Sequence, residues 1–228
     1  MPNYPPILPT VYDRFRVEET VKRIDIKEVQ RDGKPAFLLV NLLSKNECKT
    51  LINECERFGF ERADTFCHLY NDRLNDRMIS DDKDLCDLLF QRCAHLIPEK
   101  LHYVGYDEGE WTLSHLNPRW RYCKYTEGHY FGRHTDGAYR EPRDPYSPVR
   151  RRSFLTFMLY LNDKDEFEGG ATNFIKKDKI TKSIDPSAGT AIVFLQEDRD
   201  MLHEGEKLHS GTKYILRTDI MYSQPTKK

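Results

Sequence analysis

The sequence has no long apolar run and no basic segment ahead of one. Nothing in its 228 residues approaches the roughly 18 continuous apolar residues of a membrane-spanning helix. The opening stretch, MPNYPPILPTVYDRF, also lacks the charged and apolar regions of a secretory signal. We therefore expect a protein without membrane segments that stays in the cytoplasm.

An excess of charge of either sign is also missing. Charged residues make up 32% of the chain and hydrophobic residues 38%, yet the net charge is only -1. A chain with this balance has no general attraction to nucleic acid or to an anionic membrane. We therefore do not expect nucleic acid as a partner. The composition does not indicate whether the protein is a monomer or an oligomer.

Paired cysteines of the C-x-x-C type are absent. Without such pairs and without a secretory signal, neither a zinc knuckle nor a disulfide framework is expected. We predict that the six cysteines are buried free thiols. They are Cys48, Cys55, Cys67, Cys86, Cys93 and Cys123.

The first half of the chain predicts an extension, a strand and two helices. Residues 1–35 are proline-rich and then charged, which suits an N-terminal extension, so we place the single domain at 36–225. AFLLVNLL (36–43) is typical of a buried strand. Ser44 and Glu47 form a capping box before apolar residues at helical spacing, with Gly59 as the stop. A second helix is expected between a cap near Ser80 or Asp81 and Pro98.

From residue 119 the pattern changes to short strands divided by Gly, Pro, Asp and Asn. These are RWRYCKY, HYFGRHTD, SFLTFMLYLN, GGATNFI, GTAIVFL and TKYILRTDIMY. Many short strands that follow helices indicate a mainly β fold with supporting helices, an antiparallel sandwich or jelly roll. The segment 138–152, AYREPRDPYSPVRRR, contains three prolines and five arginines and is expected to be a loop.

The segment YTEGHYFGRHTDG (125–137) places an imidazole and a carboxylate two residues apart. In a strand, His134 and Asp136 would face the same side and point a nitrogen and an oxygen at one position. A third ligand is offered by His203 or His209. Two imidazoles and a carboxylate suit a redox-active Fe(II) centre with open positions. The same set suits a zinc hydrolase, which would also need a nearby general base.

Two cations share one side of a late apolar strand. In GTKYILRTD, Lys213 and Arg217 have the same strand parity, so both would face the interior. A buried cation without an anionic partner costs several kcal/mol of desolvation. An anionic cosubstrate could be that partner. Alternatively, Arg217 lies at a solvent-exposed strand end and needs no partner.

Taken in order, these segments resemble the prolyl 4-hydroxylase-like branch of the Fe(II)/2-oxoglutarate-dependent oxygenases. The resemblance covers about residues 36 to 222 and rests on AFLLVNLLSKNECKTLI, YTEGHYFGRHTDG, LTFMLYLND with EFEGGATNF, PSAGTAIVF and LHEGEKLHSGTKYILRTDIMY. It implies a double-stranded β-helix (jelly roll). It also implies an enzyme that hydroxylates a C–H bond with Fe(II), 2-oxoglutarate and O2, with ascorbate as a supporting reductant.

The resemblance also assigns individual residues. It implies that His134, Asp136 and His203, rather than His209, hold the iron, and that Lys213 holds the distal carboxylate of 2-oxoglutarate. The cosubstrate-binding set it implies consists of Lys213, Tyr125, Thr172 and Tyr160. Strand parity adds Arg217 as a second candidate cation.

The chain departs from the family in two places. The tryptophan that usually follows the lysine is Tyr214, and the segment 138–152 is long and rich in arginine. We expect this segment to overhang the iron and to bind an extended or acidic part of a peptide or protein, whose side chain is hydroxylated. Three alternatives stay open: a hydroxylase of a free amino acid or other small metabolite, a nucleic-acid dealkylase, and a non-catalytic jelly-roll binding module.

Overall fold

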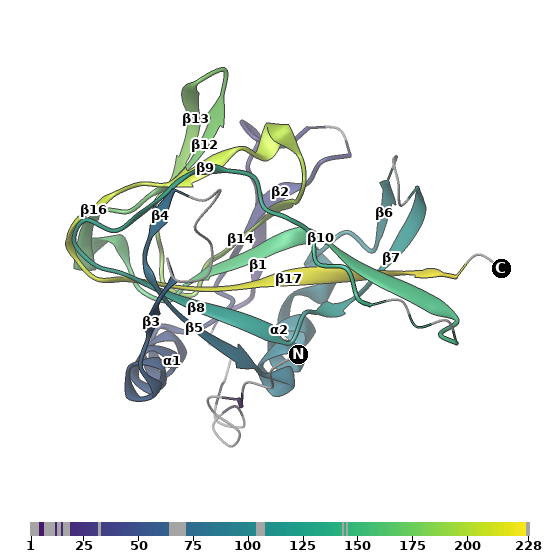
Figure 1. Ribbon diagram of the computed structural model, residues 1–228, viewed down its shortest axis with the longest axis horizontal. Helices are drawn as coiled ribbons and strands as arrows, with labels where there is room; N and C mark the ends of the chain where they lie inside the picture. The colour runs from purple at the N-terminus through teal and green to yellow at the C-terminus, as the bar shows by residue number, and fades with distance from the viewer. Residues whose placement is uncertain are drawn as a thin grey trace.

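The computed structural model describes residues 5–6, 12, 15, 19–31, 33–63, 72–103, 108–142, 144 and 146–226. Two antiparallel sheets and two helices make up its framework (Figure 1). The larger sheet has the spatial order β1 (Lys22–Asp25), β2 (Ala36–Val40), β14 (Ala191–Leu195), β10 (Val149–Tyr160), β17 (Lys213–Pro225), β8 (Arg119–Tyr125), β5 (Asp76–Asp81) and β3 (Glu61–Arg62). β7 (Gly109–Leu116) pairs with the far part of β17, and β6 (Lys100–Tyr103) pairs with β7.

The smaller sheet faces the larger one. Its order is β13 (Lys179–Ile184), β12 (Thr172–Lys176), β15 (His203–Gly205), β9 (Tyr130–His134) and β4 (Arg73–Leu74). A separate pair joins β11 (Phe167–Gly169) to β16 (Leu208–Gly211). Short 3-10 helices lie at Ala94–Leu96, Lys164–Glu166 and Arg199–Met201. Two antiparallel sheets with helices confirm the expected jelly roll, and each strand segment predicted from residue 119 onward contains a strand.

Both helices lie on one side of the larger sheet (Figure 1). Helix α1 (Lys45–Phe58) has the expected capping box between Ser44 and Glu47, and Gly59 ends it. Helix α2 (Lys83–Cys93) begins later than predicted, because Asp82 is its cap and accepts a hydrogen bond from the Leu85 amide. The cap lies one residue after Asp81, because Ser80 and Asp81 end β5, where pairing with β8 holds the backbone extended.

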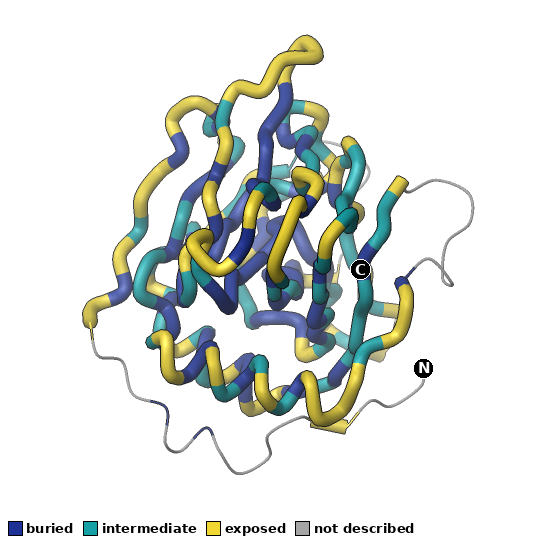
Figure 2. The backbone as a smooth tube through the Cα atoms, turned by 90° about the vertical axis from the view of Figure 1, so that its left-hand side faces the viewer, coloured by how far each residue is buried: buried dark blue, intermediate teal, exposed yellow. Residues whose placement is uncertain are grey.

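Two apolar clusters fill the molecule. One lies between the larger sheet and the helices and includes Leu51, Leu89 and Trp120. The other lies between the two sheets and includes Tyr160 and Phe194. Figure 2 shows the buried backbone at the centre and the exposed residues concentrated on hairpin tips and helix surfaces. The space between the sheets also contains the polar side chains described in the next section.

The segment 138–152 is only partly the predicted loop. Its last residues, 149–152, belong to β10 and pair with the end of β17. Arg152 is buried and pairs with Glu197 at 2.9 Å, and Arg140 pairs with the same carboxylate at 2.9 Å. The Arg150 Nε donates to Gln224 Oε1 at 3.0 Å. Long-range strand pairing therefore overrides the polar, proline-rich local pattern.

The N-terminal segment contributes a strand. β1 pairs with β2 along its whole length, and Ile26 and Val29 are buried in the cluster between the sheets. The boundary at residue 35 between an extension and a domain stays a prediction. In the part of the chain that the structure describes, no helix is long and apolar enough to cross a membrane.

The described cysteines match their prediction. They are free and buried, and they are Cys48, Cys55, Cys86, Cys93 and Cys123. Cys67 lies outside the described residues.

Candidate metal centre

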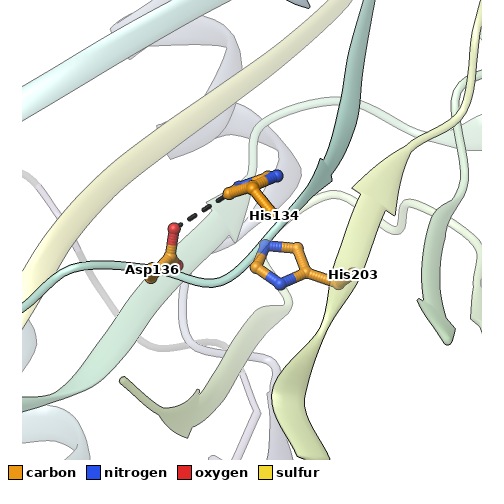
Figure 3. Close-up of side chains that lie close together, drawn as sticks. All are labelled: His134, Asp136 and His203. Atoms are coloured by element: carbon orange, nitrogen blue, oxygen red, sulfur yellow. Dashed lines mark ion pairs between the residues drawn. The ribbon is translucent and has the colours of Figure 1, made fainter. Parts of the chain in front are cut away.

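Two paired strands of the smaller sheet bring three potential metal ligands together (Figure 3). His134 ends β9 and His203 begins β15, and the register pairs these two residues directly. Their ring centroids are 4.2 Å apart. Asp136 follows β9 by two residues, and its Oδ1 lies 3.5 Å from His134 Nε2. One donor atom from each side chain lies within 4.8 Å of the others.

Backbone carbonyls orient both imidazoles. Nδ1 of His134 lies 2.8 Å from the Gly132 carbonyl, and Nδ1 of His203 lies 2.9 Å from the Met201 carbonyl. A carbonyl oxygen only accepts hydrogen bonds, so each Nδ1 carries the proton and each Nε2 keeps its lone pair. Burial lowers the pKa of His203 to about 4, so this ring is neutral at pH 7. Neutral imidazoles with a free Nε2 are the form that ligates a metal.

The Asp136 carboxylate is held on both oxygens. Thr156 Oγ1 donates to Oδ2 at 2.6 Å, and Arg217 Nη2 lies 2.9 Å from Oδ1. Burial opposes ionisation, but the Arg217 guanidinium and the two imidazoles outweigh it and hold the pKa of Asp136 well below its usual range. The group is therefore an oriented anion at neutral pH.

This donor set fits a single divalent ion. Two ligands at right angles with bonds of about 2.1 Å would be about 3 Å apart, close to the His134–Asp136 separation of 3.5 Å. Two imidazoles and one carboxylate on one side of an ion are typical of non-haem Fe(II) sites. The residues thus fit the implied iron. His209, the other histidine considered, is exposed on β16 and is not part of the cluster.

A buried lysine lies in the same cavity as the ligands. The cavity, about 670 Å³ including its open mouth, is lined by His134, Asp136 and His203 and also by Lys213 and Arg217. Lys213 is 4% exposed and begins β17, opposite Tyr125 of β8. The cavity therefore joins the potential metal ligands to a cation that the sequence predicted to face the interior.

The surroundings of Lys213 are aromatic and polar but not acidic. Its Nζ donates to the Gly170 carbonyl at 2.5 Å and lies 5.4 Å and 5.5 Å from the ring centroids of Tyr125 and Tyr160. The hydroxyl of Tyr160 is 2.7 Å from Thr172 Oγ1. Burial lowers the pKa of Lys213 to about 8. Lys213 forms no ion pair with any residue of the described chain, so an anion would complete its environment.

The sequence-predicted site residues therefore divide into two groups. Tyr125, Tyr160, Thr172 and Lys213 gather at one end of the cavity. Arg217 lies instead against Asp136, about 13 Å from Lys213 along the strand at about 3.3 Å per residue, and its role toward the cosubstrate stays a prediction.

Sequence reasoning missed further residues at the site. Thr156 contacts Asp136, and Arg73, Arg77 and Arg121 line the cavity. Arg121 has the same strand parity as Tyr125 in RWRYCKY, a signal that predicts a shared face. Arg73 lies on a two-residue strand, which is too short to show any periodicity.

Comparison with known proteins shows which family part of the chain resembles. Residues 120–218, which contain all three potential ligands and Lys213, match the model of the 2OG-Fe(II) oxygenase superfamily. A PKHD-type hydroxylase of Xylella fastidiosa strain M12 is 44% identical over 52 residues, which is 22% of this chain and 23% of the relative. The chain thus matches about a quarter of the length of this relative.

The fold likeness covers much more of the chain. The viral collagen prolyl hydroxylase of Paramecium Bursaria Chlorella virus-1 has a TM-score of 0.54 and 20% identity, over 90% of this chain and 97% of that one. A Pseudomonas putida prolyl-4-hydroxylase has a TM-score of 0.51 and 17% identity, over 84% and 93%. Residues 120–218 are thus similar to the 2OG-Fe(II) oxygenase superfamily, and the fold of the chain is similar to that of these prolyl hydroxylases.

Proposed function

We propose that the protein is a non-haem Fe(II)- and 2-oxoglutarate-dependent dioxygenase that hydroxylates a C–H bond of a peptide or protein side chain. One observation carries this proposal. The three potential ligands lie in the same cavity as Lys213, a buried cation without a carboxylate partner in the described chain. A metal site beside a cationic pocket is what a metal-bound dicarboxylate requires.

Each residue has a distinct part in this proposal. His134, Asp136 and His203 would hold Fe(II), which when bound supplies the oxidation of a C–H bond by O2 as 2-oxoglutarate is converted to succinate. Thr156 and Arg217 keep the carboxylate of Asp136 oriented and charged. The Nδ1 hydrogen bonds of His134 and His203 to backbone carbonyls hold both rings with Nε2 available for the metal.

The other end of the cavity would hold the cosubstrate. Lys213 offers its ammonium to the distal carboxylate of 2-oxoglutarate, and the hydroxyls of Tyr160 and Thr172 and the ring of Tyr125 surround it. A charge-assisted contact in a dry pocket is stronger than one in water. The apolar side chains of Met158 and Phe131 also line the cavity.

Peptide substrates are favoured by the neighbours in fold. One of them is a prolyl hydroxylase from Trichoplax adhaerens in complex with a hypoxia inducible factor peptide fragment, with a TM-score of 0.52. A cytoplasmic location and support of turnover by ascorbate belong to the same proposal. A small-metabolite hydroxylase, a nucleic-acid dealkylase and a non-catalytic binding module are the competing functions.

A substrate screen under 18O2 tests this function. The protein with Fe(II), 2-oxoglutarate and ascorbate is mixed with peptide, metabolite and methylated-oligonucleotide pools, and products are detected by mass spectrometry. We expect a peptide to gain one labelled oxygen atom while succinate forms in equal amount. Oxygen incorporation only into metabolites, loss of methyl groups from oligonucleotides, or no turnover with any pool would contradict the proposal.

A further inference from the structure

Three guanidinium groups from three strands line the outer part of the cavity. Arg73 comes from β4, Arg77 from β5 and Arg121 from β8, and all three are partly buried. Burial lowers the pKa of Arg77, as do the neighbouring charges of Arg73, Arg121 and Arg217. Cations that destabilise one another in this way create a strong local field in a chain whose net charge is only -1.

The strand register separates Arg121 from the cosubstrate end. On adjacent strands of the larger sheet, Arg121 pairs with Arg217, Cys123 pairs with Arg77, and Tyr125 pairs with Lys213. Arg121 is therefore four residues from Tyr125, about 13 Å along the strand at about 3.3 Å per residue. One cosubstrate molecule of this size cannot satisfy both Lys213 and Arg121.

The acidic residues in or beside the cavity have other partners. Asp219, beside the cavity, accepts from Gln196 at 2.8 Å and lies 3.4 Å from Arg121 Nη1, a long contact. Glu204 lies 3.5 Å from Arg133 Nε, outside the cavity lining. Asp136 pairs with Arg217. Within the described residues, none of these three carboxylates forms an ion pair with Arg73.

Arg73 is the clearest case. Its guanidinium carbon lies 5.4 Å from the Phe131 ring centroid, and within the described residues it forms no ion pair. Phe131 in turn stacks on His134, with ring centroids 3.6 Å apart. The Phe131 ring thus contacts both Arg73 and the potential metal ligand His134.

We infer that Arg73, Arg77 and Arg121 form a subsite for a carboxylate of the substrate, which in the favoured case is an acidic side chain beside the hydroxylated residue of a peptide. The inference rests on the proposed function. Guanidinium groups bind carboxylates through paired hydrogen bonds, and a partly buried site strengthens each one. The three arginines converge on one cavity rather than along a groove, which favours a single anionic group over a nucleic-acid backbone.

Binding measurements test this subsite without requiring turnover. The probe is a fluorescent alternating proline–glutamate peptide, compared with the matching proline–glutamine peptide, on protein saturated with Mn(II) and 2-oxoglutarate. We expect the glutamate peptide to bind at least about tenfold more tightly, since a charge-assisted hydrogen bond contributes about 1.5–3 kcal/mol. Arg73→Gln and Arg121→Gln should each remove most of that preference, and unchanged thermal unfolding would show that both variants fold.

Arg57→Gln is the matched control, because Arg57 is exposed, pairs with Glu54 at 2.6 Å and does not line the cavity. It should bind the peptide like the wild type. Equal affinity for the two peptides, or full affinity in Arg73→Gln, would overturn the subsite. Loss of 2-oxoglutarate binding in Arg73→Gln would also overturn it, because the arginines would then serve the cosubstrate.

Competitors distinguish the source of the anion. Free glutarate, inorganic phosphate and a single-stranded oligonucleotide are added to the bound peptide. Weak displacement by all three supports binding of a peptide carboxylate. Displacement by glutarate, phosphate or oligonucleotide at a lower concentration than unlabelled peptide would show that the subsite does not prefer a peptide carboxylate. Arginine-dependent peptide binding without any succinate formation would keep the subsite and reject the proposed function.

Discussion

At the scale of single residues, the site depends on side chains that hold other side chains. Asp136 is fixed by Thr156 and Arg217, and each imidazole is fixed by a backbone carbonyl. These contacts define which atom of each ligand faces the centre. Removing one of them should therefore alter metal affinity even though no ligand is lost.

Thr156→Val tests this dependence. The valine cannot donate to Asp136 Oδ2, and loss of an outer partner typically costs about 10–100-fold in metal affinity. Calorimetric titration with Mn(II) should show this weakening. Thr218→Val is the control, because the Thr218 hydroxyl donates to the Asn117 carbonyl instead. Equal metal affinity in the two variants would contradict the role given to Thr156.

Lys213 predicts a pH dependence of 2-oxoglutarate binding. The free ammonium has a pKa of about 8 because burial disfavours its charge. A bound carboxylate favours the charged form and raises that pKa, so binding takes up a proton once the pH exceeds about 8. Affinity should then fall roughly tenfold per pH unit above that value.

Titrations of 2-oxoglutarate in the presence of Mn(II), from about pH 7 to about pH 9.5, measure this dependence. Lys213→Arg is the matched variant, since a guanidinium stays charged over this range. Its affinity should be independent of pH across the same interval. A wild-type affinity that stays constant to the upper limit would show that Lys213 does not hold the anion.

The sequence predicted part of this residue set. The two-residue spacing predicted that His134 and Asp136 lie together, although β9 ends at His134 and Asp136 follows the strand. The choice between His203 and His209 was not local: both follow the same turn-rich segment, and only the pairing of β15 with β9 brings His203 to His134. Arg73 gave no signal, because its strand is held by long-range pairing with β9.

At the scale of elements, the helices are joined to the larger sheet by a buried ion pair. Arg92 of α2 contacts both oxygens of Glu47 in α1, at 2.8 Å and 3.0 Å, and donates to the Leu42 carbonyl at 3.0 Å. Both charged side chains are under 10% exposed. This pair fixes the two helices relative to the end of β2.

Arg92→Leu should destabilise the fold by about 3–5 kcal/mol, because it leaves the Glu47 carboxylate buried without its partner. The double variant Glu47→Leu/Arg92→Leu removes the unpaired charge and should recover much of the loss. Urea unfolding measures both. Lys83→Leu breaks an exposed pair with Asp87 and should change stability by less than about 1 kcal/mol. An Arg92→Leu loss as small as that of Lys83→Leu would contradict this account.

The sequence predicted the boundaries of an element correctly where local signals, such as caps and periodicity, agreed with the strand pairing of the fold. Helix α1 followed its capping box and its periodic apolar residues. The start of α2 and the end of the 138–152 segment differ from what the local sequence predicts. There β5 and β10 extend through residues whose composition favours caps and loops. Pairing with β8 and β17 determines both boundaries, and neither partner is near in sequence.

At the scale of the whole molecule, the two sheets form opposite walls of one cavity. One wall carries potential metal ligands and the other carries cations. The smaller sheet carries His134 and His203, and the larger sheet carries Lys213 and the arginines of β5 and β8. The expected jelly roll gave this arrangement in outline, because strand order along the chain is visible in the sequence. The positive outer cavity was not predicted, since its charges come from strands distant in sequence.

Succinate formation by three proteins tests the central claim most directly. Wild type, His203→Ala and His209→Ala are each incubated with Fe(II), 2-oxoglutarate and ascorbate in air, and succinate is followed by proton NMR. The wild type and His209→Ala should form succinate at similar rates, and His203→Ala should form none, because it lacks one of only three protein bonds to iron. Succinate from His203→Ala at the wild-type rate, or its loss in His209→Ala alone, would contradict the metal centre described for this protein.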